Sequence, residues 1–141
     1  MNTTKSGALE DLRVDVRVKL AALWAAVLFL FAYGDIFAFF RADVIKDVIA
    51  GKISGIEISQ AFLLGTSAYI LIPSAMVFLS LVLKPAWSRW TNIGFGAGYA
   101  LSVVAFAIGE TWAYYIFLTV AECVLLLLIV WYAWRWPRLS A

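Results

Sequence analysis

Two acidic residues, Asp35 and Glu122, lie inside long, otherwise uncharged apolar stretches of this 141-residue chain. The sequence contains no histidine, and no lysine or arginine lies within either stretch. A carboxylate in hydrocarbon costs several kcal/mol unless it is protonated, hydrogen-bonded, hydrated or paired with a cation. We therefore expect polar chemistry, such as the binding of a proton or a cation, at these two positions.

Glu122 lies near the middle of its apolar stretch, twelve residues after Glu110 and thirteen before Arg135. Tyr115, Thr119 and Glu122 are spaced by four and three residues, so they share one face of a helix. This polar stripe could hydrate the acid or conduct a proton or a small cation. Three interpretations stay open: a protonated acid that holds helices together, an acid that titrates and couples proton movement to transport, and a site for a lipid, a quinone-like ligand or a partner.

Asp35 lies six residues before Arg41, and Gly34 directly precedes it. In one interpretation the helix breaks at Gly34, and Asp35 caps a short continuation over residues 36–40. In the other, Asp35 lines an acidic, aromatic cavity that opens to the outer side of a membrane. The candidate ligand- or proton-binding residues are Asp35, Glu122, Glu110, Tyr115, Thr119, Tyr33, Tyr69 and Tyr99.

Other kinds of chemistry find little support in the sequence. With no histidine and one cysteine, the chain lacks the usual nitrogen and sulfur ligands of a transition-metal site, so we expect no metal and no cofactor. The serines and threonines of the apolar stretches have no partner base besides the acids, so catalysis is not expected. A net charge of +2 is too small to suggest nucleic-acid binding.

The composition defines the class of protein. Hydrophobic residues make up 65% of the chain and charged residues 14%, and the mean hydropathy is +0.93. These values predict an all-α integral membrane protein. Charged residues bound four stretches long enough to span a membrane as helices, at about residues 19–40, 58–83, 90–109 and 111–134. We predict an antiparallel four-helix transmembrane bundle, one domain over residues 1–141 with a polar leader at 1–18.

The segment of residues 41–57 joins the first two predicted spans and is amphipathic. Its apolar residues at helical spacing predict a short helix on the outer membrane surface that ends near Gly51. Within the second span, Pro73 removes one helical hydrogen bond and leaves the carbonyl of Tyr69 unpaired, which predicts a kink.

Small residues mark the faces where helices approach closely in lipid, and Gly65, Gly94 and Gly98 are the glycines expected there.

The basic residues predict the orientation. Eight lie on the side of the two termini and the second loop, and three lie in the first loop. The eight are Lys5, Arg13, Arg17, Lys19, Lys84, Arg89, Arg135 and Arg138, and the three are Arg41, Lys46 and Lys52. Because cytoplasmic loops carry the excess of basic residues, both termini are predicted to be cytoplasmic.

Three stretches resemble a family of small four-span bacterial membrane proteins of unknown function: ALWAAVLFLFAYGDIFAFF, SQAFLLGTSAYILIPSAMVFLSLVLKPAWSRWTNI and GETWAYYIFLTVAECVLLLLIVWYAWRWP. The Tyr-Gly-Asp string at 33–35 and the Gly-Glu-x-Trp-Ala-Tyr-Tyr string at 109–115 are its most specific pieces. The resemblance extends over about residues 15–137. It implies a multi-pass protein of the bacterial cytoplasmic (inner) membrane, and it implies no activity.

Two functions are consistent with these features. The leading hypothesis is a ligand-binding or transport protein whose outer-facing acidic and aromatic cavity surrounds Glu122 and Asp35. Its ligand would be a small cationic or hydrophobic molecule. The alternative is an accessory subunit, in which the acids are structural and the chain binds membrane lipid and either a second copy of itself or a larger membrane partner.

Overall fold

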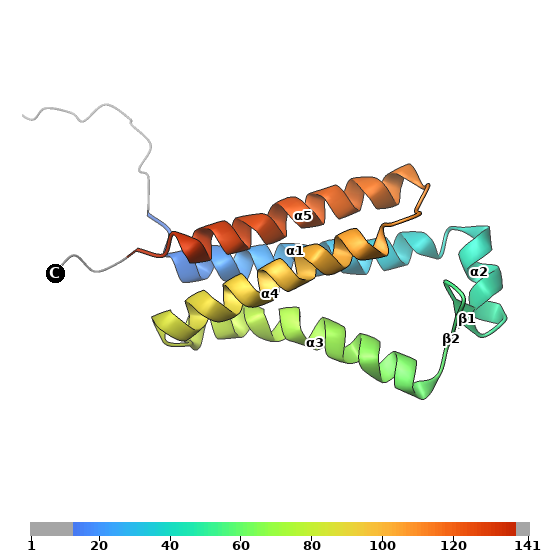
Figure 1. The fold of residues 1–141 in the computed structure, drawn as a ribbon, viewed down its shortest axis with the longest axis horizontal. Helices are drawn as coiled ribbons and strands as arrows, with labels where there is room; N and C mark the ends of the chain where they lie inside the picture. Colours follow the sequence, from blue (N-terminus) through green and yellow to red (C-terminus); the bar gives the residue numbers. More distant parts are fainter. Residues whose placement is uncertain (1–12, 138–141) are drawn as a thin grey trace, which may run out of the picture.

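A computed structural model of the chain describes residues 13–137, in which five helices and one short hairpin form (Figure 1). The helices are α1 (Val16–Ala38), α2 (Ala42–Ile49), α3 (Gln60–Val82), α4 (Pro85–Phe106) and α5 (Ala113–Trp134), and the strands are β1 (Lys52–Ile53) and β2 (Ile56–Glu57). Residues 13–137 are therefore all-α apart from four strand residues. Residues 1–12 of the predicted leader lie outside the described part.

Three helices, α1, α3 and α5, are long and apolar enough to cross a membrane. The helix α4 has a similar length of 22 residues but a more polar composition, with asparagine, serine and glycine among its residues, and it is not one of the three.

The ends of the helices follow from local sequence. The side chain of Asp15 accepts a hydrogen bond from the Arg17 amide at 2.8 Å and caps α1, and Ser59 caps α3 in the same way. Pro85 occupies the first turn of α4, where its fixed φ angle suits a helix and its missing N–H is not needed. As a result α4 begins five residues before the predicted span of 90–109.

Figure 1 shows the four long helices side by side, each running opposite to the one before it. The helix α1 packs against α3 and α5, and α4 packs against α5, whereas α3 and α4 touch only sparsely. Figure 1 also shows α3 diverging from its neighbours toward the end that carries α2. The residues that do join α3 to α4 therefore matter for keeping the two helices together.

The buried core lies mainly in the half of the bundle that contains the turn between α3 and α4. Its members are Leu20, Trp24 and Val27 of α1, Met76 of α3, Tyr99 and Val103 of α4, and Leu126, Ile129 and Ala133 of α5.

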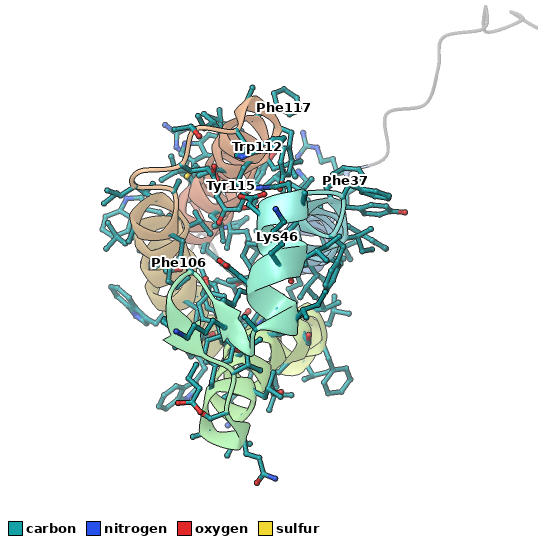
Figure 2. The ribbon with its side chains drawn as sticks, turned by 90° about the vertical axis from the view of Figure 1, so that its right-hand side faces the viewer. Phe37, Lys46, Phe106, Trp112, Tyr115 and Phe117 are labelled. Atoms are coloured by element: carbon teal, nitrogen blue, oxygen red, sulfur yellow. The ribbon has the colours of Figure 1, made fainter. Side chains whose placement is uncertain are left out.

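A short helix, α2, forms where the apolar spacing predicted one, and the hairpin that follows it was not predicted. Ser54 and Gly55 make the turn with φ angles of 47° and 80°, a conformation that glycine adopts without strain. Lys52 pairs with Glu57 across the two strands. Figure 2 looks onto this end of the molecule and shows α2 and the hairpin lying across the ends of the long helices.

The glycine that allows two helices to approach is not one of those predicted. A methyl group added at Gly96 of α4 would lie 3.0 Å from the Cγ2 atom of Val130 on α5. At Gly65, Gly94 and Gly98 it would meet nothing within 4 Å among the described residues. The close packing predicted for these three glycines is therefore not found within the described chain, and Gly96 supplies it instead.

Candidate functional site

Asp35 lies within an uninterrupted helix. The helix α1 continues through Gly34 and Asp35 to Ala38, so Asp35 is not the N-cap of a separate short helix. The interpretation of Asp35 as a helix cap is therefore wrong. A single glycine costs a helix interior about 1 kcal/mol relative to alanine, which is too little to break a helix that packs on both α3 and α5.

Glu122 points from α5 into the bundle, with only 8% of its surface exposed. It lies close enough to Asp35 of α1 for the two carboxyl groups to interact electrostatically. Within residues 13–137, neither acid makes a hydrogen bond or an ion pair with another side chain or with the backbone. The structure thus brings together the two acids that the sequence singled out, and no basic group of the described chain neutralises them.

The predicted polar stripe on α5 faces the same interior. Thr119 is buried like Glu122, and Tyr115 is partly buried. Tyr115 also lies within electrostatic range of both acids of the pair. In Figure 2, Tyr115 lies on the side of α5 that faces the other helices, whereas Phe117 points away from them.

Tyr33 does not join this group. Its ring is half-exposed and packs against Phe37 of its own helix, with centroids 6.0 Å apart.

Tyr69 and Tyr99 use their hydroxyl groups to join α3 to α4. Pro73 has no N–H to offer the Tyr69 carbonyl, and the Tyr99 hydroxyl donates a hydrogen bond to that carbonyl in its place. The Tyr69 hydroxyl lies 2.6 Å from the hydroxyl of Ser102, and the two tyrosine rings pack with centroids 4.7 Å apart. The carbonyl freed by Pro73 is therefore satisfied. Tyr99 is buried, Tyr69 lies within electrostatic range of Glu122, and the hydroxyl groups of both tyrosines join α3 to α4.

Glu110 belongs to a separate ion-pair cluster at the α2 end. Arg41 donates hydrogen bonds to Glu110 at 3.0 Å and to Asp43 at 2.7 Å, and its guanidinium lies 4.6 Å from the ring centroid of Trp112. The second oxygen of Glu110 accepts the backbone amides of Thr111 and Trp112 just before α5 begins. Glu110 is thus occupied in fastening the α1–α2 connection to the α4–α5 connection, and it does not line the site of Asp35 and Glu122.

The surroundings of Glu110 make the α2 end sensitive to acid. Burial acts to raise the pKa of Glu110, but the amides of Trp112 and Thr111 and the Arg41 guanidinium outweigh it, so its pKa lies below 4.5. A group with a lowered pKa in the folded state adds stability above its unfolded-state pKa, and that stability is lost as the pH falls through the folded-state pKa.

We expect Glu110→Gln to lower the free energy of unfolding by about 1 kcal/mol at pH 7, because the ion pair and its charge-assisted hydrogen bonds are lost. The decline in stability of the wild-type protein below about pH 4.5 should become shallower in this variant, because the titrating group is gone. Unfolding titrations at pH 7, 5 and 3.5 measure both effects. Asp47→Asn, at an exposed acid of α2, is the control and should match the wild-type pH profile. An equal acid-induced loss in Glu110→Gln and wild type would contradict the assignment.

A buried polar network near the α3–α4 turn was not predicted. Asn92 accepts hydrogen bonds from the indole of Trp24 at 2.7 Å and from the Ser80 hydroxyl at 3.2 Å, and it donates to the Ser88 carbonyl at 2.7 Å. Asn92, Ser80, Ser88 and Trp24 have no exposed surface. The network joins α1, α3 and α4, and its signal in the sequence was the pair of polar residues Ser88 and Asn92, four apart on one helical face.

These features define the class of the molecule: a small helical protein whose described residues include three helices of membrane-spanning length and two acids, the buried Glu122 and the exposed Asp35, that interact electrostatically and make no ion pair. The chain belongs to a family of unknown function, DUF6326, which matches residues 11–140. No curated protein and no solved structure matches the chain.

Proposed function

We propose that this chain is a four-span protein of a bacterial inner membrane, in which α1, α3, α4 and α5 are the spans and residues 1–141 form one domain. The outer surface of these helices supports the proposed four spans. Large apolar side chains are exposed on each of them, among them Phe29 of α1 (66%), Leu64 of α3 (73%), Leu101 of α4 (74%) and Phe117 of α5 (72%). Exposed apolar surface on every side suits contact with lipid, and α4 shares this feature although its interior face is polar.

The proposed orientation has both termini in the cytoplasm. Besides the excess of basic residues on that side, arginines and lysines stack on aromatic rings at the same end of the bundle: Lys19 on Tyr132, Arg89 on Trp90 and Trp134, and Arg135 on Trp131. Tryptophan, tyrosine and basic residues of this kind gather at membrane interfaces. The end with α2 then faces the outer side.

The proposed activity is the binding of a proton or a cation at Asp35 and Glu122, coupled to transport across the membrane. One observation carries the proposal: Glu122 is 8% exposed, lies in electrostatic range of Asp35, and has no hydrogen-bond or ion-pair partner within residues 13–137. Two like charges that interact across the poorly hydrated environment of a membrane repel each other strongly. A proton or a cation removes that repulsion, so the pair has an intrinsic affinity for one or the other.

The polar stripe on α5 gives the proposed site a route to water. Tyr115 and Thr119 lie between Glu122 and the α2 end of α5, and they offer hydroxyl groups along the inward face of the helix. A proton or a small hydrated cation would reach Glu122 from the outer side along this stripe.

Infrared titration of the purified protein tests the proposal. We expect the wild-type carboxyl groups of the pair to change protonation between about pH 5 and 8 in two coupled steps. Glu122→Gln and Asp35→Asn should each leave a single step, and Cys123→Ser, next to Glu122 in the chain, should leave both. Carboxyl groups that stay protonated up to pH 9 would contradict a proton- or cation-binding role and would make Glu122 a structural residue.

A second candidate function is that of an accessory subunit, and the exposed face of α5 favours it. Phe117, Val120, Val124, Leu127, Trp131 and Trp134 are all exposed and recur every three or four residues along one stripe. Such a stripe suits contact with another membrane helix as well as with lipid. Photo-crosslinking from position 124 in native membranes should then capture a second copy of the chain or a larger membrane protein, whereas adducts with lipid alone would contradict this function.

A further inference from the structure

A groove runs along the outside of the molecule between α1 and α3. It has a volume of about 530 Å³ and is lined by Ala25, Leu28, Phe29, Phe31, Ala32, Asp35, Ile70 and Ser74. Pockets that hold small organic molecules have volumes of about 300–1,000 Å³ and mostly apolar walls. In the proposed membrane orientation this groove opens sideways toward lipid, so a ligand would reach it from within the bilayer.

Asp35 makes the groove complementary to a positively charged ligand. It is the only charged residue of the lining, and it makes no ion pair within residues 13–137. The other polar lining residue, Ser74, donates its hydroxyl proton to the Ile70 carbonyl of its own helix at 2.8 Å and is already satisfied. A carboxylate at the edge of an apolar groove suits a positive charge on an apolar body. It disfavours lipid phosphate groups, which are negatively charged.

Asp35 also connects the groove to the interior of the bundle. It lines the groove on one side of α1 and lies within electrostatic range of Glu122 on α5. A positive charge arriving beside Asp35 would therefore change the charge state that the pair favours, because the two carboxyl groups interact.

We propose that the groove binds an amphiphilic organic cation that enters from the lipid, and that its binding displaces the proton held by Asp35 and Glu122. This inference rests on the proposed proton- or cation-binding function and specifies the class of ligand. In the step, one carboxyl O–H bond breaks, the proton passes to water, and the carboxylate that remains neutralises the bound cation. The proton forms a new O–H bond to the water that accepts it, and charge is conserved.

Tetraphenylphosphonium is the probe for this proposal, with tetraphenylborate as a control of the same shape and opposite charge. We expect saturable binding of the cation by the wild-type protein in detergent, measured by equilibrium dialysis, and no saturable binding of the anion. Calorimetry in two buffers of different ionisation enthalpy should show release of about one proton per cation bound. Asp35→Asn should weaken binding at least about tenfold. Equal binding of the two ions, or unchanged binding by Asp35→Asn, would overturn the proposal.

Variants that fill the groove separate its role from the general stability of the protein. Ala32→Phe on α1 and Ser74→Phe on α3 both place a ring in the groove. Ala22→Phe is the matched control, since Ala22 is exposed on α1 and does not line the groove. We expect the first two variants to lose at least about tenfold in affinity for the cation and the control to keep wild-type affinity. Wild-type affinity in both groove variants would show that the cation binds elsewhere.

The infrared titration of the carboxyl pair distinguishes failure of this inference from failure of the proposed function. If the pair titrates in two coupled steps but tetraphenylphosphonium does not bind, the groove inference is wrong, and a lipid chain is the remaining occupant. If the pair does not titrate, the proposed function and this inference are both overturned.

Discussion

Replacing Asn92 by leucine is expected to lower the free energy of unfolding by about 2–3 kcal/mol, because buried donors lose their acceptor. The side-chain oxygen of Asn92 accepts from Trp24 and Ser80, which belong to two other helices and have no exposed surface. Leucine is likewise branched at its γ carbon and offers no acceptor, so the indole N–H and the serine hydroxyl would stay buried without partners. Unfolding by SDS in mixed micelles measures the difference.

The residue next to Asn92 and one of its hydrogen-bond partners supply the controls. Thr91→Val removes a hydroxyl that bonds only to carbonyls of its own helix, and it should change the free energy of unfolding by less than about 0.5 kcal/mol. Removing the indole donor and its acceptor together, in the double variant Trp24→Phe and Asn92→Leu, should cost less than the sum of the two single changes, since the indole N–H is then no longer left buried without an acceptor. An Asn92→Leu variant as stable as Thr91→Val would show that the network does not hold these helices together.

The same residue explains why the packing face of α4 was mispredicted from the sequence. Small residues at spacing four placed Gly94 and Gly98 on one face, but spacing alone does not say which face of a helix is buried. A polar side chain does, because an amide is costly to expose to lipid. Placing Asn92 inside also puts Gly96, Tyr99 and Val103 inside, and these are buried. The uncharged polar residue Asn92 therefore indicates which face of α4 is buried, and the spacing of the small residues does not.

On α5, Glu122 indicated which face of the helix is buried. Glu122 placed inside predicts that Thr119 is inside with it, and both are buried. What the spacing could not give is the partner across the bundle. Asp35 and Glu122 are separated by 86 intervening residues and two further long helices. Their proximity depends on α1 packing against α5, which no local pattern reports.

The role of Glu110 could also not be predicted from the residues next to it in the sequence. As an acid at the end of an apolar stretch it resembled a cavity residue, but its charge is taken by Arg41, 69 residues away in the sequence. The prediction considered Arg41 as a residue six positions after Asp35 and as one of the three basic residues of the first loop, and it did not pair Arg41 with Glu110. The turn at Phe39 and Phe40 ends α1 before Arg41, so its side chain is free to reach the α4–α5 connection.

The hydrogen bond from Tyr99 to the carbonyl freed by Pro73 gives a prediction with an internal test. Tyr99→Phe is expected to lower the free energy of unfolding by about 1–2 kcal/mol, because the Tyr69 carbonyl, which Pro73 leaves without its usual helical N–H, loses the donor that α4 supplies. The ring contact with Trp24 would survive in phenylalanine, so the loss reports on the hydroxyl. The measurement is the same SDS titration.

Pro73→Ala should cancel most of that loss. Alanine at this position restores an N–H four residues after Tyr69, and the carbonyl then has a partner within α3. In the Pro73→Ala background we expect Tyr99→Phe to cost less than about 0.5 kcal/mol, a coupling of about 1 kcal/mol between two residues on different helices. Additive effects would instead show that the Tyr99 hydroxyl does not serve the freed carbonyl.

Tyr69→Phe distinguishes this compensation from a general loosening of the α3–α4 contact. It removes the hydroxyl that bonds to Ser102, on the same two helices, but leaves the Tyr69 carbonyl with its donor. Its effect should therefore be the same with proline or alanine at position 73. If only Tyr99 is coupled to position 73, then Pro73 makes α3 depend on α4 for one main-chain hydrogen bond. This bond lies where the two helices otherwise touch only sparsely, and Tyr69 there lies within electrostatic range of Glu122.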